Sequence, residues 1–113
     1  MTNLKTFCVS DIPSKNLEKL NLDLVGVGQK KFSKEYLTCD NGINIQSKEK
    51  YYSELTFHYW FWKNMLNNLI ENLWIGFCQK RRFWIKDNSS KINNIDDLKK
   101  NVLRSIPNEW SNY

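Results

Sequence analysis

The chain has 113 residues, of which 41% are hydrophobic, 14% aromatic and 26% charged, and its formal net charge is +5. A chain of this length and composition forms one compact domain, so a large multidomain enzyme and a disordered protein are both excluded. The excess of basic residues favours anionic partners such as phosphates, nucleotides, RNA or acidic lipid headgroups, without choosing among them.

Cysteine content and the first residues bear on the cellular compartment. The three cysteines, Cys8, Cys39 and Cys78, are odd in number and too widely spaced for a C-x-x-C motif, so neither a disulfide framework nor a zinc site is indicated. Residues 1–10 lack the apolar core of a secretory signal, and no run approaches the roughly eighteen apolar residues of a membrane span. We expect a cytoplasmic protein whose only membrane contact would be peripheral, at the inner face of the membrane.

The first third of the chain predicts a strand, a helix and a second strand. The β-prone residues 6–10 end before Pro13, which lacks the amide donor that a strand needs. Ser14 is placed to cap a short helix that extends to Leu20. Residues 22–28, alternating and then apolar, predict a second strand with a glycine exit that suits a phosphate.

The middle of the chain combines a long polar segment with a long helical pattern. Residues 34–50 lack a regular period, and a loop of this length in a compact domain is more often functional than idle. From Tyr51 to Leu73, apolar residues recur three and four positions apart, which predicts one amphipathic helix. The stripe that we expect to face the core consists of Leu55, Tyr59, Trp62, Leu66, Leu69 and Leu73.

The last third predicts a third strand and a final helix. Residues 74–78 form a buried strand pattern that a basic turn follows directly, and Asn93 or Asn94 is placed to cap a helix that Pro107 ends. This order of elements is typical of a small three-layer, Rossmann-like α/β domain, with a parallel sheet of three strands and flanking helices. Ligands of such sheets bind at the carboxyl ends of the strands, where this chain has polar and basic loops.

Glu54 and His58 are the weak candidates for acid–base chemistry. They lie four positions apart in the predicted helix and therefore share one face. For an isolated pair of this spacing, ordinary packing of a histidine beside a glutamate is the more frequent explanation. The crowding of tyrosine, tryptophan, histidine and glutamate within residues 51–64 favours a lined cleft, because buried polar tips need partners or water.

Several sequence blocks, in order, resemble a bacterial family first catalogued as a domain of unknown function. The blocks are VGVG at 25–28, DNGINI at 40–45, YSELT at 52–56, YWFWKN at 59–64, WIGF at 74–77 and RRF at 81–83. The family is found in capsule and lipopolysaccharide loci and is taken to comprise glycosyltransferases of the GT-A-like type. The resemblance implies that residues 1–113 are the amino-terminal, nucleotide-sugar-binding half of such an enzyme, and so an incomplete domain.

The resemblance implies a nucleotide-sugar donor and a saccharide or lipid-linked acceptor in surface polysaccharide biosynthesis. The candidate substrate-binding residues are Gly28, Asp40, Asn44, Glu54, Tyr59, Trp62, Lys63, Arg81 and Arg82. Guanidinium groups bind phosphate oxygens two at a time, so the paired arginines are candidates for holding the diphosphate, with a solvated basic loop as the alternative. We expect the tryptophan-rich helix and both arginines to converge on one hollow at the tips of the strands.

No metal site is predicted in this chain. Asp96 and Asp97 are adjacent and lie at a predicted helix start, so they do not form an Asp-x-Asp motif, and a divalent metal would need ligands in a longer protein. Motifs for hydride transfer, ATP hydrolysis and serine hydrolase chemistry are absent. Two alternatives stay open: an inactive truncated fragment, and a basic aromatic nucleic-acid-binding module, which the dispersed lysines and the lack of an RNP-like strand disfavour.

Overall fold

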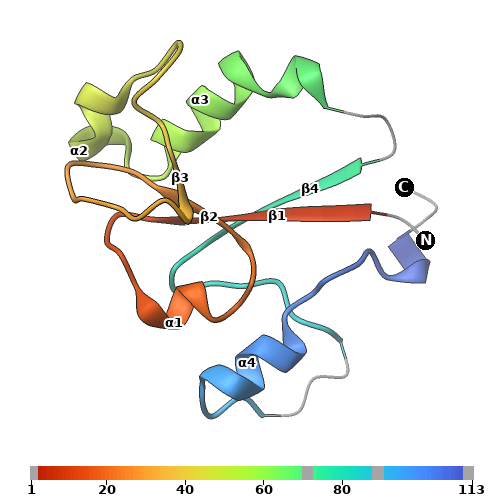
Figure 1. Cartoon of the computed structure of the whole chain (residues 1–113). Helices are drawn as coiled ribbons and strands as arrows, with labels where there is room; N and C mark the ends of the chain where they lie inside the picture. Colours follow the sequence, from red (N-terminus) through yellow and green to blue (C-terminus); the bar gives the residue numbers. More distant parts are fainter. Residues whose placement is uncertain (1–2, 70–72, 88–90, 111–113) are drawn as a thin grey trace.

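The chain folds around a parallel sheet that carries helices on both faces (Figure 1). The computed structural model describes residues 3–69, 73–87 and 91–110. The predicted α/β class, a parallel sheet with flanking helices, is confirmed. The elements in chain order, with η for short 3-10 helices, are β1 (Asn3–Ser10), α1 (Lys15–Glu18), β2 (Asp23–Gly26), β3 (Tyr36–Thr38), η1 (Gln46–Lys48), α2 (Glu49–Tyr52), α3 (Leu55–Asn64), η2 (Leu66–Asn68), β4 (Leu73–Gln79), α4 (Ile95–Asn101) and η3 (Asn108–Trp110).

The sheet has the strand order β3-β2-β1-β4, and every pair of neighbouring strands is parallel. β1 is central, with residues 7–10 paired to β2 and residues 3–9 paired to β4. From β1 the chain moves to one side through β2 and β3, and then returns to the other side for β4. β1 and β4 therefore flank the point at which the direction of the sheet reverses, where the ends of parallel strands leave a crevice.

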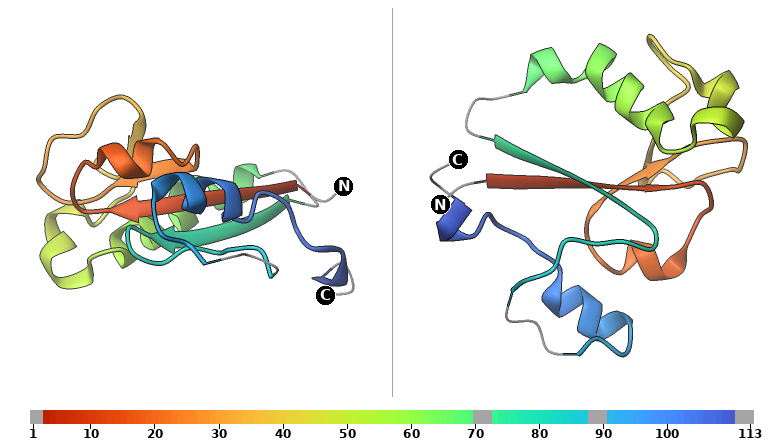
Figure 2. Two further views of the ribbon diagram at one scale, coloured as in Figure 1. Left: turned by 90° about the horizontal axis from the view of Figure 1, so that it is seen from below. Right: turned by 180° about the vertical axis from the view of Figure 1, so that it is seen from behind.

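Alternate side chains of β1 point to opposite faces of the sheet and take part in two separate cores. Phe7 faces α3, and its ring centroid lies 5.2 Å from that of Phe57 and 5.5 Å from that of Phe61. Cys8 faces the other layer, where it packs in one cluster with Leu17 of α1. Figure 1 and Figure 2 show α2 and α3 on one side of the sheet and α1 and α4 on the other.

The structure has one strand more than the sequence predicted. β3 lies within residues 34–50, which were expected to form a loop, and it has only three residues, too few for alternation to be recognised. Its first residue, Tyr36, is buried. The Tyr36 hydroxyl accepts a hydrogen bond from the Ser14 amide at 2.9 Å and donates to a Glu18 carboxylate oxygen at 3.0 Å. These bonds fasten β3 to α1.

The single long helix predicted for residues 51–73 is wrong in extent. α2 and α3 are separated because Ser53 adopts a left-handed backbone conformation with a φ of 52°. α3 ends at Asn64, and the shorter η2 follows it. Residues 70–72 lie outside the described part of the chain, and β4 begins directly after them. Among the described residues, no helix combines the length and the apolar character needed to cross a lipid bilayer.

The face of α3 that packs on the sheet is not the predicted one. Most of the predicted stripe points outward, since Leu55 and Trp62 are each 56% exposed and Leu66 is 48% exposed, whereas Leu69 packs against the core as predicted. Phe57 and Phe61 pack on the sheet instead. Phenylalanine has no polar tip, so its burial costs no hydrogen bond, whereas tyrosine and tryptophan tolerate partial contact with water.

The two outer helices begin where predicted but end earlier, and α1 ends at Glu18 rather than Leu20. Ser14 caps α1 and Asn94 caps α4, because each side-chain oxygen accepts a hydrogen bond from the backbone amide three residues later, at 3.3 and 2.8 Å. α4 ends at Asn101 rather than near Pro107. The chain turns extended at Val102, whose side chain is 2% exposed, so burial of this residue ends the helix early.

Candidate functional site

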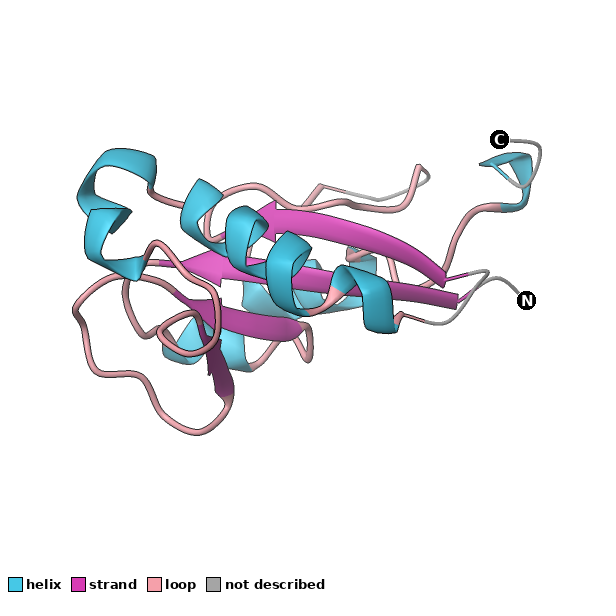
Figure 3. Cartoon of the chain, turned by 90° about the horizontal axis from the view of Figure 1, so that it is seen from above, coloured by secondary structure: helices cyan, strands magenta, loops and turns pink. Residues whose placement is uncertain are grey.

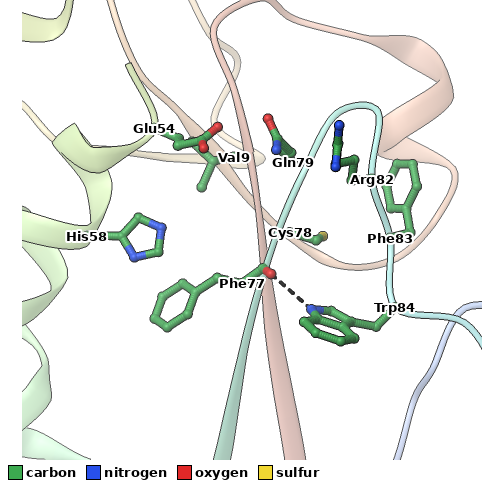
Figure 4. A pocket seen from close by; sticks show the side chains of 9 residues that line it. All are labelled: Val9, Glu54, His58, Phe77, Cys78, Gln79, Arg82, Phe83 and Trp84. Atoms are coloured by element: carbon green, nitrogen blue, oxygen red, sulfur yellow. Dashed lines mark hydrogen bonds between the residues drawn. The ribbon is translucent and has the colours of Figure 1, made fainter. Parts of the chain in front are cut away.

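A pocket of about 370 Å³ lies at the carboxyl ends of β1 and β4, where the direction of the sheet reverses (Figure 4). Ligands of open parallel sheets bind at this kind of position. Its wall combines residues of both strands, of the start of α3 and of the turn after β4. The lining residues are Val9, Glu54, His58, Phe77, Cys78, Gln79, Arg82, Phe83 and Trp84.

α3 supplies the two titratable groups of one wall, Glu54 and His58. The His58 ring lies against the Phe77 ring, with centroids 4.5 Å apart, and Figure 4 shows both beside the end of β4. Burial lowers the pKa of His58 below its ordinary value, and the Glu54 carboxylate opposes this shift in part. Among the described residues no hydrogen bond joins the two side chains. His58 is therefore neutral near pH 7 and can accept a proton.

The opposite wall is formed by the turn after β4. Gln79 and Arg82 close this turn through two backbone hydrogen bonds of 3.2 and 3.0 Å, which bring Arg82 to the exposed rim of the pocket. Within the described ranges no carboxylate forms an ion pair with Arg82. The Trp84 indole donates a hydrogen bond to the Phe77 carbonyl at 3.0 Å, so this ring also lies at the pocket (Figure 4).

The two arginines diverge, so the expectation that both converge on one hollow is wrong. Arg81 lines a second cavity, between α1 and α4 on the other face of the sheet. Lys80 lines that cavity too, and its ammonium lies 2.5 Å from an Asp11 carboxylate oxygen. This hydrogen bond is the largest influence that lowers the pKa of Asp11 below its ordinary value. Of the three consecutive cations after β4, Arg82 is the one that lines the pocket.

Most of the other residues proposed from the sequence lie outside this pocket. Tyr59, Trp62 and Lys63 are on the side of α3 that points away from the sheet, where the Lys63 ammonium lies 3.8 Å from the centroid of the Trp62 ring. Asp40 and Asn44 form hydrogen bonds within or beside their own loop. The structure thus brings Glu54, His58 and Arg82 together and leaves these five residues elsewhere.

Gly28 shapes the loop after β2 rather than the wall of the pocket. Its backbone has a φ of +91°, and a Cβ atom at this position would lie 2.5 Å from a carboxylate oxygen of Glu49. The Gly28 carbonyl accepts a hydrogen bond of 2.7 Å from the Gln46 side chain. The positive φ favours glycine here, because residues with a Cβ atom rarely adopt this backbone conformation, whereas the end of the Glu49 side chain could move aside.

Sequence reasoning did not single out several residues that line the pocket. Val9, Phe77 and Gln79 are the last residues of their strands on the α3 side, so their role follows once the strand order is known. No feature of the sequence pointed to Trp84, because its position at the pocket depends on the turn that Gln79 and Arg82 close. The rule that ligands meet the carboxyl ends of parallel strands directed attention to the loops after the strands, and it extends to Val9, Phe77 and Gln79 once the register is known.

The described residues do not offer a metal site. No three histidine, cysteine, aspartate or glutamate side chains gather among them in an arrangement that could hold an ion. Cys8 and Cys78 are cross-strand neighbours in β1 and β4, and contact with the Cys8 thiol together with burial raises the pKa of Cys78 well above its ordinary value. The described residues therefore supply no ligand set for the divalent metal that was considered for a longer protein.

Residues 11–109 match a family model described as a domain of unknown function, DUF4422. No curated protein and no solved structure matches the chain. The match begins directly after β1 and covers the end of β4, the turn that follows it and the helices on either side of the sheet. On this match, the chain belongs to the DUF4422 family.

Proposed function

We propose that the pocket between β1 and β4 binds a nucleotide sugar, and that the protein is a glycosyltransferase or the donor-binding part of one. The observation that carries the proposal is the meeting of Arg82, His58 and Glu54 at the point where the sheet reverses direction. An anion-binding group and a proton acceptor thereby face each other across a cavity of about 370 Å³. This volume falls in the range of roughly 300–1,000 Å³ that is usual for ligand pockets.

Arg82 is suited to the diphosphate of the donor. When the sugar is transferred, the bond from its anomeric carbon to the diphosphate breaks, and negative charge develops on the departing nucleoside diphosphate. A guanidinium without an ion pair can bind two phosphate oxygens at once and stabilise that charge. Trp84, whose side chain is 54% exposed at the same rim, offers a ring on which a base or sugar can stack.

His58 and Glu54 are suited to the acceptor. The acceptor hydroxyl forms the new bond to the anomeric carbon and must lose its proton to a base. A histidine that burial keeps neutral can take that proton, and the carboxylate of Glu54 stabilises the imidazolium that results. We propose a saccharide or a lipid-linked acceptor of surface polysaccharide biosynthesis, as the sequence resemblance implies.

The experiment is a calorimetric titration of the chain with uridine and guanosine diphosphate sugars. We expect at least one donor to bind, and Arg82→Gln to weaken it by about tenfold or more, because hydrogen bonds to charged groups contribute roughly 1.5–3 kcal/mol. Arg81→Gln is the matched control, since it removes the same charge from the other face of the sheet.

The control should bind within about twofold of the parent, as expected for a cation that does not touch the ligand. Equal losses in the two variants would show that only net charge matters, and the pocket would then not be the donor site. Absence of binding to every donor would reject the proposed function outright.

A further inference from the structure

We propose that the outward side of α2, α3 and η2 docks the protein on an anionic lipid surface. Exposed and half-exposed apolar side chains cover this side, and we call them the outer face: Tyr51, Tyr52, Leu55, Tyr59, Trp62 and Leu66. The proposal rests on this surface alone and does not depend on nucleotide-sugar binding.

The outer face is a continuous stripe. Leu55, Tyr59 and Trp62 are three or four positions apart in α3 and therefore lie on one side of that helix, and the exposed Leu66 follows at the start of η2. The Tyr59 and Trp62 rings touch edge to face, with centroids 6.0 Å apart. Figure 3 looks onto this layer and shows no strand or other helix crossing in front of α3. The face is thus uncovered among the described elements.

An apolar stripe on this side of a helix needs an explanation. The side of a surface helix that is opposite to its core-facing side is normally polar, but here Leu55 and Trp62 are each 56% exposed while Phe57 fills the core behind them. Single exposed apolar residues are common, whereas a contiguous patch marks an interaction surface. The stripe therefore indicates a partner that covers it.

The charges around the stripe favour an anionic partner. Within residues 46–69 the basic residues Lys48, Lys50 and Lys63 are all exposed. The acidic residues of the same segment turn away, since Glu49 lies against Gly28 and Glu54 lines the pocket. The chain as a whole carries a net charge of +5. Anionic headgroups complement such a rim of ammonium groups.

The composition of the stripe also matches a lipid interface. Tyrosine and tryptophan gather where hydrocarbon meets water, because each has an apolar ring and a polar tip. The Lys63 ammonium lies 3.8 Å from the Trp62 ring centroid, and the Lys50 ammonium lies 5.0 Å from that of Tyr51. Lysines beside aromatic rings can extend their ammonium groups to the headgroups while the rings enter the lipid, as in amphipathic helices that lie in the interface.

A second copy of the chain fits the stripe less well. In a two-fold contact each surface meets a copy of itself, so Lys63 and Lys50 would face a surface that carries the same positive charges. Like charges in such proximity oppose association. A lipid surface buries the same apolar groups and supplies charges of opposite sign.

Docking would also set the distance of the pocket from the lipid. Tyr59 of the outer face directly follows His58 of the pocket, so both sit on one helix, which is about 10 Å across. The pocket would lie about one helix diameter from the lipid surface. This would suit an acceptor carried on a lipid, a consequence that rests on the proposed function, whereas the docking does not.

The test is flotation of the chain with phosphatidylcholine vesicles that contain or lack phosphatidylglycerol. We expect binding to the anionic vesicles, and the double variant Trp62→Gln, Leu66→Gln should weaken it by about tenfold or more through loss of buried apolar area. Ile12→Gln is the matched control, because Ile12 is 43% exposed and lines the cavity on the opposite side of the sheet, and it should bind as the parent does.

Charge is tested by a second matched pair. Lys63→Gln should weaken binding to the anionic vesicles by about fivefold, whereas Lys15→Gln, an exposed lysine on α1, should leave binding unchanged. Thermal unfolding of each variant verifies that it is folded. Binding that is absent, or that is equal in the double variant and the parent, would overturn the proposal. A dimer that the double variant abolishes, without vesicle binding, would assign the face to self-association and would also overturn it.

Discussion

The two sides of α3 contain similar residues but have opposite surroundings. The inner side has Phe57, Trp60 and Phe61, which are 0%, 6% and 5% exposed. The outer side has Tyr59 and Trp62 beside leucines, and Trp62 is 56% exposed. Hydrophobic periodicity alone selected the outer side as the core. Both stripes repeat at helical spacing, so the period identifies the helix without identifying its buried face.

Hydrogen-bonding capacity distinguishes the two sides. On the inner side Trp60 is the one residue of the three with a polar group, and its indole donates to the Asn41 carbonyl at 2.8 Å. On the outer side the polar tips of Tyr59 and Trp62 can reach water, with Lys63 beside both rings. A stripe of phenylalanines should therefore be given more weight as core than a stripe of tyrosine and tryptophan.

The largest difference between the two sides should appear on truncation. Phe57→Ala should lower the free energy of unfolding by about 3–5 kcal/mol, because this ring is fully buried among the aromatic residues of β1 and β4. Trp62→Ala should change the free energy of unfolding by at most about 0.5 kcal/mol, since its ring is more than half exposed. Urea denaturation measures both, and similar losses in the two variants would contradict the assignment of the faces.

A smaller effect should separate the two tryptophans. Trp60→Phe removes the donor to the Asn41 carbonyl and should cost about 0.5–1.5 kcal/mol, the usual net contribution of one hydrogen bond, because the exposed Asn41 can turn to water instead. Trp62→Phe removes no such hydrogen bond and serves as the control. Thermal unfolding compares them, and an unchanged melting temperature for Trp60→Phe would show that its hydrogen bond adds nothing to stability.

The smallest effect concerns His58, at the border between the core and the pocket. Its pKa in the folded protein is below the ordinary 6.5, chiefly because of burial. Below pH 6.5 the unfolded chain therefore binds the proton first, and His58 makes the fold less stable as the pH falls toward its lower folded pKa. Above pH 6.5 this penalty is absent.

Glu54→Gln sharpens this prediction. The Glu54 charge raises the pKa of His58, so its removal should lower that pKa further. The chain has one histidine, so an NMR titration of the imidazole protons gives the value without ambiguity. A pKa that rises in this variant would mean that the two side chains do not face each other as described.

Much of the fold could be predicted because local signals and topology agreed. Ser14 and Asn94 cap their helices, as their side chains and positions suggested. β3 could not be predicted, because three residues hold no alternation and it is their pairing with β2 that makes them a strand. The break at Ser53 was equally hidden, since neither glycine nor proline marks its left-handed backbone.

The candidate site could be predicted in part. Glu54 and His58 are four positions apart, so they share a helical face whichever side of the helix is buried, and their common orientation could be predicted from this spacing. The separation of Arg81 from Arg82 could not be foreseen, because it depends on the turn that Gln79 and Arg82 close. Arg81 and Arg82 are adjacent in the sequence but lie at cavities on opposite faces of the sheet, and neither composition nor a motif predicts this separation.

The most direct measurement is an NMR titration of the isotopically labelled chain with the nucleotide sugar that binds best. The account predicts saturable shift changes at Val9, His58, Gln79 and Arg82, around the reversal of the sheet, and little change at Arg81. Changes centred on the Arg81 cavity, or on the loop of Asp40 and Asn44 instead, would contradict the account.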